Sequence, residues 1–270
     1  MLILRLLLFT FLHVALAHGA GPAPVLTDAW RALAEGLFSD ANELFSAARA
    51  AHPGDRAAQL GEALSLLQLQ PHTNSRVQRG VNMLEALLAE DTADEIGVRA
   101  RYFRARAEHV HRLSPTPLAA ASHYERVISE HPAHPLAGQA TVKLALIRLY
   151  RMQTPVELAF EFSGFTERAS TLPSAAARRD LHLILGEAAL RLDLGEAAAL
   201  DHFLAALDVG IELRPMRADT LVRVGELAAE LSRPDIARAH YAAFMEEFPR
   251  DPRFLAVSER HAALPSPATP

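Results

Sequence analysis

Residues 218–251 read ADTLVRVGELAAELSRPDIARAHYAAFMEEFPRD, and this stretch carries two apolar stripes at helical spacing. The first stripe consists of the apolar and small residues Leu221, Val224, Gly225 and Ala228. Pro249 closes the second stripe, which consists of Ile236, Ala237, Tyr241 and Phe244. Between the stripes Pro234 interrupts the pattern, because proline has no amide hydrogen to donate to the preceding helical turn. The stretch therefore predicts two helices joined by a short turn.

The spacing of the second stripe occurs at two other places in the chain. A small residue is followed four places on by an aromatic, three later by a small or apolar residue, and five later by proline. The three sets are Ala41, Phe45, Ala48 and Pro53; Ala120, Tyr124, Val127 and Pro132; and Ala237, Tyr241, Phe244 and Pro249. An Ala-rich helical bundle would produce one such set by chance. Three sets that each end in proline favour a repeated unit instead.

The helix–turn–helix unit resembles the tetratricopeptide repeat (TPR). The small residues that this family has at its eighth and twentieth positions match Gly225 and Ala237, and its closing proline matches Pro249. The resemblance covers nearly all of residues 25–252. It implies an all-α superhelix, a TPR solenoid of about five to six repeats, in which each unit buries its apolar faces against its neighbours.

Six units can be aligned along the chain, three closely and three loosely. The close matches are residues 22–55, 101–134 and 218–251, although Glu108 replaces the small eighth residue in the second of them. The loose matches are residues 56–92, 135–172 and 179–212, the last with Gly186 as its small residue. Small residues allow the paired helices to approach closely, whereas Tyr241 and Phe244 are expected to reach the next repeat.

The two ends of the chain are expected to lie outside the solenoid. Residues 1–17 are predicted to be a signal peptide cleaved after Ala17, because an apolar run precedes an A-x-A pattern. The run is shorter than the ~20 residues that a helix needs to span a bilayer. An uncleaved anchor is the alternative. We expect a flexible lead-in at 18–24, a capping helix at 253–263 and a disordered proline-rich tail at 264–270.

Composition indicates a helical protein, and the sequence predicts no cofactor. Hydrophobic residues make up 50% of the chain but aromatic residues only 6%, so the apolar content is dominated by residues that favour helices. The net charge of −5 argues against a nucleic-acid partner, which requires a basic surface. The chain has no cysteine, which excludes disulfides and thiol nucleophiles. It also lacks the common catalytic motifs, so the sequence does not predict an enzyme.

The chain has thirteen histidines, each a potential metal ligand. His109 and His111 are two apart, and residues at this spacing point to different faces of a helix. His131 and His134 lie in a turn, but two ligands without carboxylate partners are too few for a metal site. The sequence therefore predicts solvated histidines and no metal.

The segment VRARYFRARAEHVHR (98–112) gathers arginines in the first helix of a unit. In TPR proteins first helices line the concave groove, and the resemblance implies ligand contacts near their second, fifth, ninth and twelfth residues. This places Tyr102, Ala105, His109 and Arg112 in the groove, with Lys143 from the next first helix as a looser candidate. Arg112 and protonated His109 would then hold a carboxylate, similar to TPR carboxylate clamps. The alternative is a solvated arginine face balanced by Glu108 and neighbouring acids.

Three functions fit these observations. The preferred one is a non-catalytic exported scaffold that binds a protein or peptide through its concave face, in the periplasm or outside the cell. Its repeats are similar to those of bacterial cell-envelope TPR proteins. The second is an enzyme acting on envelope polysaccharide, which would need two converging carboxylates. The third is a TPR adaptor anchored in the inner membrane. The sequence names neither the partner nor the oligomeric state.

Overall fold

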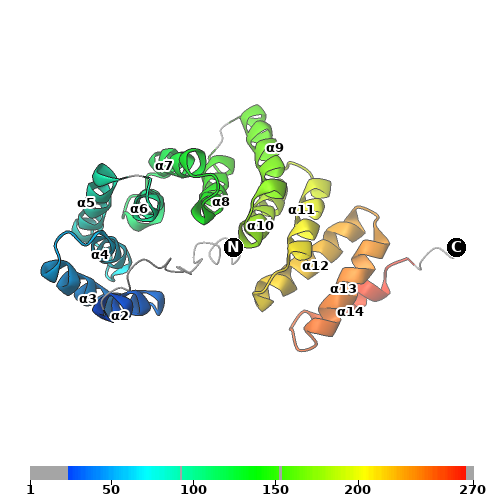
Figure 1. The fold of residues 1–270 in the computed structure, drawn as a ribbon. Coiled ribbons are helices and arrows are strands. Elements are labelled where there is room, and N and C mark those ends of the chain that lie inside the picture. The colour runs from blue at the N-terminus through cyan, green and yellow to red at the C-terminus, as the bar shows by residue number, and fades with distance from the viewer. Residues whose placement is uncertain (1–23, 92, 152–153, 266–270) are drawn as a thin grey trace. The chain divides into compact units, whose positions relative to one another are not determined.

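The structure is a computed structural model that describes residues 24–265 except 92, 152 and 153 (Figure 1). Every regular element in these residues is helical, which agrees with the all-α prediction. The expected signal peptide, residues 18–23 of the lead-in and residues 266–270 of the tail lie outside the described residues. The described chain divides between Ile147 and Arg148 into two compact units.

The first unit contains three antiparallel helix pairs and most of a seventh helix. The pairs are α2 (Pro24–Ala34) with α3 (Phe38–Ala51), α4 (Arg56–Gln68) with α5 (Asn74–Glu90), and α6 (Glu95–Arg106) with α7 (Pro117–Glu130). A π-helical segment, η2 (Ala107–His111), continues α6. The seventh helix is α8 (Pro135–Leu149), which crosses the boundary in its last turn. The expected unit 135–172 is thus divided between the two compact units.

The second unit begins with α9 (Pro155–Thr171) and contains two antiparallel pairs. These are α10 (Ala175–Arg191) with α11 (Glu196–Val209), and α12 (Arg214–Glu230) with α13 (Pro234–Glu247). A final helix, α14 (Phe254–Ala262), packs against α13 and occupies the segment expected to cap the solenoid. In the described part of the chain no helix is both long and apolar enough to cross a membrane.

Local sequence accounts for where the helices begin. The side chains of Asp55, Thr73 and Asp94 each accept a hydrogen bond from a backbone amide in the first turn of α4, α5 and α6 respectively. Proline occupies the first helical position in α7 and α13, where its missing amide hydrogen costs nothing. The cap at Asp94 starts the third pair at Glu95, six residues before the unit expected at 101–134.

The aromatic residues of the repeat pattern pack into notches left by glycine. An added Cβ at Gly225 would lie 2.3 Å from Tyr241 Cε1, and one at Gly186 would lie 2.7 Å from Phe203 Cε1. Each of these glycines belongs to the first helix of the same pair as its aromatic partner. Tyr241 therefore packs back onto its own pair, because the glycine leaves room there, and it also lies near enough to Arg260 of α14 to be influenced electrostatically.

Phe45 makes the same kind of contact with a different neighbour. Its ring lies against Gly61, where an added Cβ would be 2.2 Å from Phe45 Cε1. Gly61 belongs to α4, the first helix of the following pair, so this ring joins two pairs. Trp30 packs edge-on against Phe45, with ring centroids 4.9 Å apart. The small and aromatic residues of the three matched sets are fully or almost fully buried apart from the half-buried Ala48, and their closing prolines are exposed in turns.

Ion pairs connect the last three helices of the second unit. Arg217 of α12 forms two 2.6 Å hydrogen bonds with the carboxylate of Glu247 on α13. Arg253, just before α14, bonds Asp219 of α12 at 2.7 Å and lies over the ring of Phe244 at 5.4 Å. Phe244 thus meets the segment that follows its own pair, as the sequence pattern predicts.

Candidate partner-binding surface

Glu108, which replaces the expected small residue, is the centre of a buried ionic cluster. It is 5% exposed in the π-helical segment η2 and accepts hydrogen bonds from Arg104 Nη1 and Arg112 Nε, each at 2.6 Å. The hydroxyl of Thr116 donates a third bond. Burial alone would raise the pKa of Glu108, but the bonds from Arg112, Thr116 and Arg104 outweigh it and lower the pKa to about 2. Glu108 balances the charges of Arg104 and Arg112, as the alternative interpretation of the arginine-rich segment predicted. Glu108 itself, however, lies inside the protein rather than in solvent.

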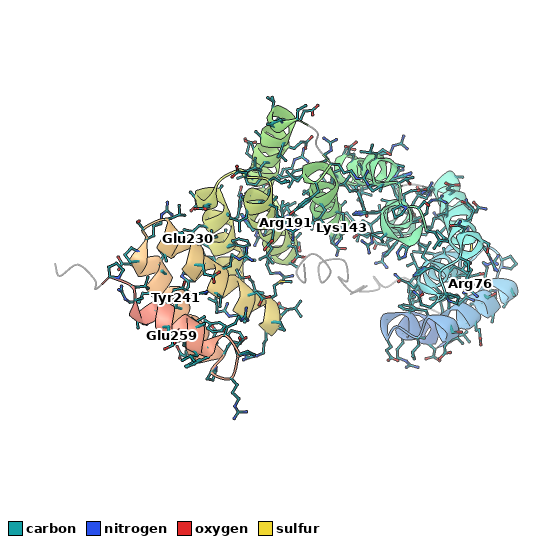
Figure 2. The ribbon with its side chains drawn as sticks, turned by 180° about the vertical axis from the view of Figure 1, so that it is seen from behind. Arg76, Lys143, Arg191, Glu230, Tyr241 and Glu259 are labelled. Carbon is teal, nitrogen blue, oxygen red and sulfur yellow. The ribbon has the colours of Figure 1, made fainter. Side chains whose placement is uncertain are left out.

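Two of the five residues predicted to contact a partner, Tyr102 and His109, lie against Tyr124. Tyr102 is 4% exposed, and its ring centroid lies 5.8 Å from that of Tyr124. His109 Nδ1 lies 3.4 Å from the Tyr124 hydroxyl. Lys143, labelled on α8 in Figure 2, is 2% exposed and lies close enough to influence His109 electrostatically. The side chains of Tyr102 and Lys143 are therefore covered by the surrounding helices.

His109 does not supply the second positive charge of the hypothesised clamp at neutral pH. Burial, together with the charges of Arg106 and Lys143, lowers its pKa to about 4. Arg112 points elsewhere: its Nη1 donates to Gln78 Oε1 on α5 at 3.2 Å. Ala105, also predicted to face the groove, is fully buried. The structure thus brings together Tyr102, His109 and Lys143, and places Arg112 at a different surface.

Two further histidines singled out from the sequence, His111 and His134, are also held by the protein. His111 is 8% exposed, which corrects the expectation that it is solvated. The segment η2 packs against α4, where His111 bonds the backbone of Leu67, and burial lowers its pKa to about 3. His134 Nε2 lies 2.9 Å from Glu95 Oε2. Among the residues that the structure describes, no three or more His, Cys, Asp or Glu side chains form a group suited to a metal ion.

Arg112 lines an open surface along α5, which we call the α5 groove. The groove consists of two adjoining hollows of about 460 and 490 Å³ that share Ser75 and Gln78. The first is lined by Arg49, Gln59, Ser75, Gln78, Arg79, Asn82, Met83 and Ala86. The second is lined by Asn74, Ser75, Gln78, Arg112 and Ser114. Neither lining contains a carboxylate, so the groove does not present the facing acids that glycoside hydrolysis would require.

A buried carboxylate beneath the groove orients two of its arginines. Glu62 is fully buried on α4 and accepts hydrogen bonds from Arg49 Nε at 2.6 Å and Arg79 Nη2 at 2.5 Å. The side chain of Arg79 remains 57% exposed and that of Arg49 37% exposed. Charge-assisted bonds of this kind are the strong ones in proteins. Glu62 therefore fixes two guanidinium groups at the floor of an open hollow.

An amide connects the two hollows. Gln78 accepts a hydrogen bond from Arg112 and donates one from its Nε2 to Asn82 Oδ1 at 2.7 Å. These bonds settle which end of each amide is the oxygen, and they leave the NH₂ group of the exposed Asn82 side chain as a donor. Arg76, labelled at the start of α5 in Figure 2, donates to the carbonyl of Pro71 and so steadies the turn that precedes the groove.

The groove residues on α5 were not singled out from the sequence. The TPR resemblance directs attention to first helices, whereas α5 is the second helix of its pair. A signal was present, since Ser75, Gln78, Arg79 and Asn82 share one face of a helix whose opposite face is apolar. A polar helical face is usually solvated surface, and the hollow arises only from the side chains of neighbouring helices.

The second unit contains a separate polar chain across three helices. Thr166 of α9 donates to the carbonyl of Phe162 at 2.9 Å, so its oxygen accepts from His202 Nε2 at 3.2 Å. His202 Nδ1 is then the acceptor for His182 Nδ1–H at 3.0 Å. Burial, followed by the neighbouring His182, lowers the pKa of His202 to about 4. Both histidines are therefore neutral at pH 7, and the pair links α9, α10 and α11.

No protein-family model and no curated protein sequence matches the chain. Among solved structures, PilF from Pseudomonas aeruginosa is similar over 87% of this chain and 95% of its own, with 14% identity and a TM-score of 0.56. A tetratricopeptide repeat protein from Parabacteroides merdae covers 88% of this chain and 96% of its own, with 14% identity and a TM-score of 0.44. At this identity the PilF match concerns the fold alone. Together with the paired helices, it confirms the predicted all-α TPR-like solenoid fold.

Proposed function

We propose that this chain is a non-catalytic, exported scaffold that binds a protein or peptide partner in the bacterial cell envelope. The observation that carries the proposal is the α5 groove, an open surface on stacked helix pairs that is lined by hydrogen-bonding side chains and by no carboxylate. Stacked pairs present such extended surfaces to partners in helical-repeat proteins generally. The PilF-like fold is consistent with this role.

Of the residues expected to face a partner, Arg112 is given the direct contact, because it lines the groove. Tyr102 and Lys143 lie beneath the surface, and His109 is half-buried. The contacts of Tyr102 and His109 with Tyr124 join α6, η2 and α7, and so support the first-helix face.

Export rests on the amino-terminal sequence, and it has a direct test. Expression of the full chain in a bacterium, followed by fractionation and amino-terminal sequencing, should recover mature protein that begins at His18. Recovery of the uncleaved chain in the inner membrane would support the anchored adaptor instead.

Partner binding is tested by affinity capture from cell-envelope extract, using the chain from His18 onward as bait. The expected result is the capture of one defined protein. After purification, that protein should also bind the purified chain directly. Hydrolysis of an envelope glycan by the purified chain would overturn the non-catalytic assignment, and the absence of any protein that binds the purified chain would overturn the scaffold assignment.

A further inference from the structure

The α5 groove is locally basic on an acidic protein. Its lining contains three arginines, Arg49, Arg79 and Arg112, and no aspartate or glutamate. The chain as a whole has a net charge of −5. A surface whose sign opposes that of the whole protein attracts partners of the opposite charge and orients them as they approach.

The carboxylates that hold these arginines lie below the groove rather than in it. Glu62 is 0% exposed and Glu108 is 5% exposed, so a ligand above them meets the guanidinium groups first. Each guanidinium has five N–H groups. In the described part of the chain, Arg49 and Arg79 each donate one of them to Glu62, which leaves further N–H groups for a ligand.

The neutral groups of the groove add hydrogen-bond donors. Because Gln78 donates to Asn82 Oδ1, the Asn82 side chain presents its NH₂ group. The Gln78 oxygen is already occupied by Arg112 Nη1. The surface is therefore rich in donors, and its complement is a ligand rich in acceptors, above all carboxylates, which arginine binds in a two-point geometry.

The groove also has a length. From Asn74 to Ala86 the lining follows α5 for twelve residues, or about 18 Å at the helical rise of 1.5 Å per residue. An extended peptide advances about 3.3 Å per residue, so five or six residues span the groove. We propose that the α5 groove binds an extended acidic segment of about this length in a partner protein. The inference rests on the proposed scaffold function and names the chemistry of its partner.

The test uses the chain from His18 onward and two fluorescein-labelled peptides, one with six consecutive glutamates and one with six glutamines. Fluorescence anisotropy at low ionic strength should give an affinity at least tenfold higher for the glutamate peptide, and added salt should remove most of the difference. Equal affinity for the two peptides, or no binding of either, would overturn the acidic-segment proposal.

Variants locate the binding site. Gln78→Glu combined with Asn82→Asp places two negative charges in the groove on exposed side chains of nearly unchanged shape. We expect this double variant to bind the glutamate peptide about tenfold more weakly. Gln139→Glu is the matched control, because residue 139 is an exposed glutamine on α8 outside the groove lining. Circular dichroism melts of all variants report whether the fold is retained.

The outcomes distinguish a failure of the groove proposal from a failure of the proposed scaffold function. If the groove variant and the control bind the glutamate peptide as the unchanged chain does, the peptide binds elsewhere and the groove proposal is wrong. If anionic vesicles or an acidic polysaccharide compete fully with the peptide at the groove while peptides from the captured partner do not, the ligand class is wrong. In both cases a captured protein that still binds the purified chain would leave the scaffold function standing.

Discussion

Replacing Gly225 with alanine should destabilise the second unit, although alanine is the better helix former. An alanine Cβ would lie 2.3, 2.5 and 2.8 Å from Cε1, Cδ1 and Cζ of Tyr241, far inside normal contact distance. The ring is rigid and 1% exposed, so it has no open space to move into. Overpacking of a core costs about 1–3 kcal/mol. The intrinsic gain from glycine to alanine in a helix is about 1 kcal/mol and offsets only part of this cost.

The expected net loss is up to about 2 kcal/mol in the free energy of unfolding, measured by urea denaturation followed by circular dichroism. Gly164→Ala is the matched control, because nothing lies within 4 Å of its added Cβ. That change in the interior of α9 should stabilise the protein by about 0.5–1 kcal/mol. The two substitutions are chemically identical and should act in opposite directions.

A double-mutant cycle connects the loss to the ring. In a Tyr241→Ala background the notch is vacant, so Gly225→Ala should cost nothing or should stabilise the protein. If Gly225→Ala alone stabilises the protein as much as Gly164→Ala does, the close approach of ring and backbone does not limit the packing of α12 and α13.

Acidification should weaken the fold between about pH 6.5 and 4, because the unfolded chain takes up a proton that His202 in the folded chain does not, at up to about 1.4 kcal/mol per pH unit for this residue. Urea titrations at several pH values give the free energy of unfolding as a function of pH, and this dependence should be shallower for His202→Gln. An unchanged pH dependence would contradict the lowered pKa of His202. Glu62→Gln removes the carboxylate beneath the α5 groove and should cost about 2–4 kcal/mol of stability while it weakens binding of the glutamate peptide. A variant as stable as the unchanged protein would show that Glu62 does not anchor the arginines. Ala237→Leu should lower stability by about 1–3 kcal/mol, since residue 237 is fully buried between paired helices. A melting temperature equal to that of the unchanged protein would contradict this expectation.

Much of the fold could be predicted because the interval between small and aromatic residues encodes which helix faces are buried. Ala41 with Phe45 and Ala237 with Tyr241 occupy the same positions in two similar pairs, and all four residues are buried. What the interval does not encode is the partner of each ring. Phe45 meets a glycine in the next pair whereas Tyr241 meets one in its own, because the choice depends on where the notch lies on the neighbouring helix.

The candidate site was less accessible to sequence reasoning. Arg112 was singled out by counting along a regular helix, but the π-helical segment shifts the register by one residue and turns its side chain toward Gln78. That segment contains the buried Glu108, whose three donors come from residues on both sides of it. Counting residues along a regular α-helix therefore misplaces Arg112, because the backbone of this segment does not keep the α-helical register.

The different partners of the aromatic rings affect how the chain unfolds. In a linear array of repeats, the free energy of unfolding is approximately the sum of the intrinsic stability of each hairpin and the interaction energy between neighbouring hairpins. Phe203 and Tyr241 contribute to the first quantity, since each closes its own hairpin, whereas Phe45 contributes to the second. Fraying of the first hairpin would therefore spread to the second through the uncovered surface of Gly61. In the carboxyl-terminal unit, Phe203 and Tyr241 each pack within their own hairpin, so we expect these two hairpins to unfold more independently of one another.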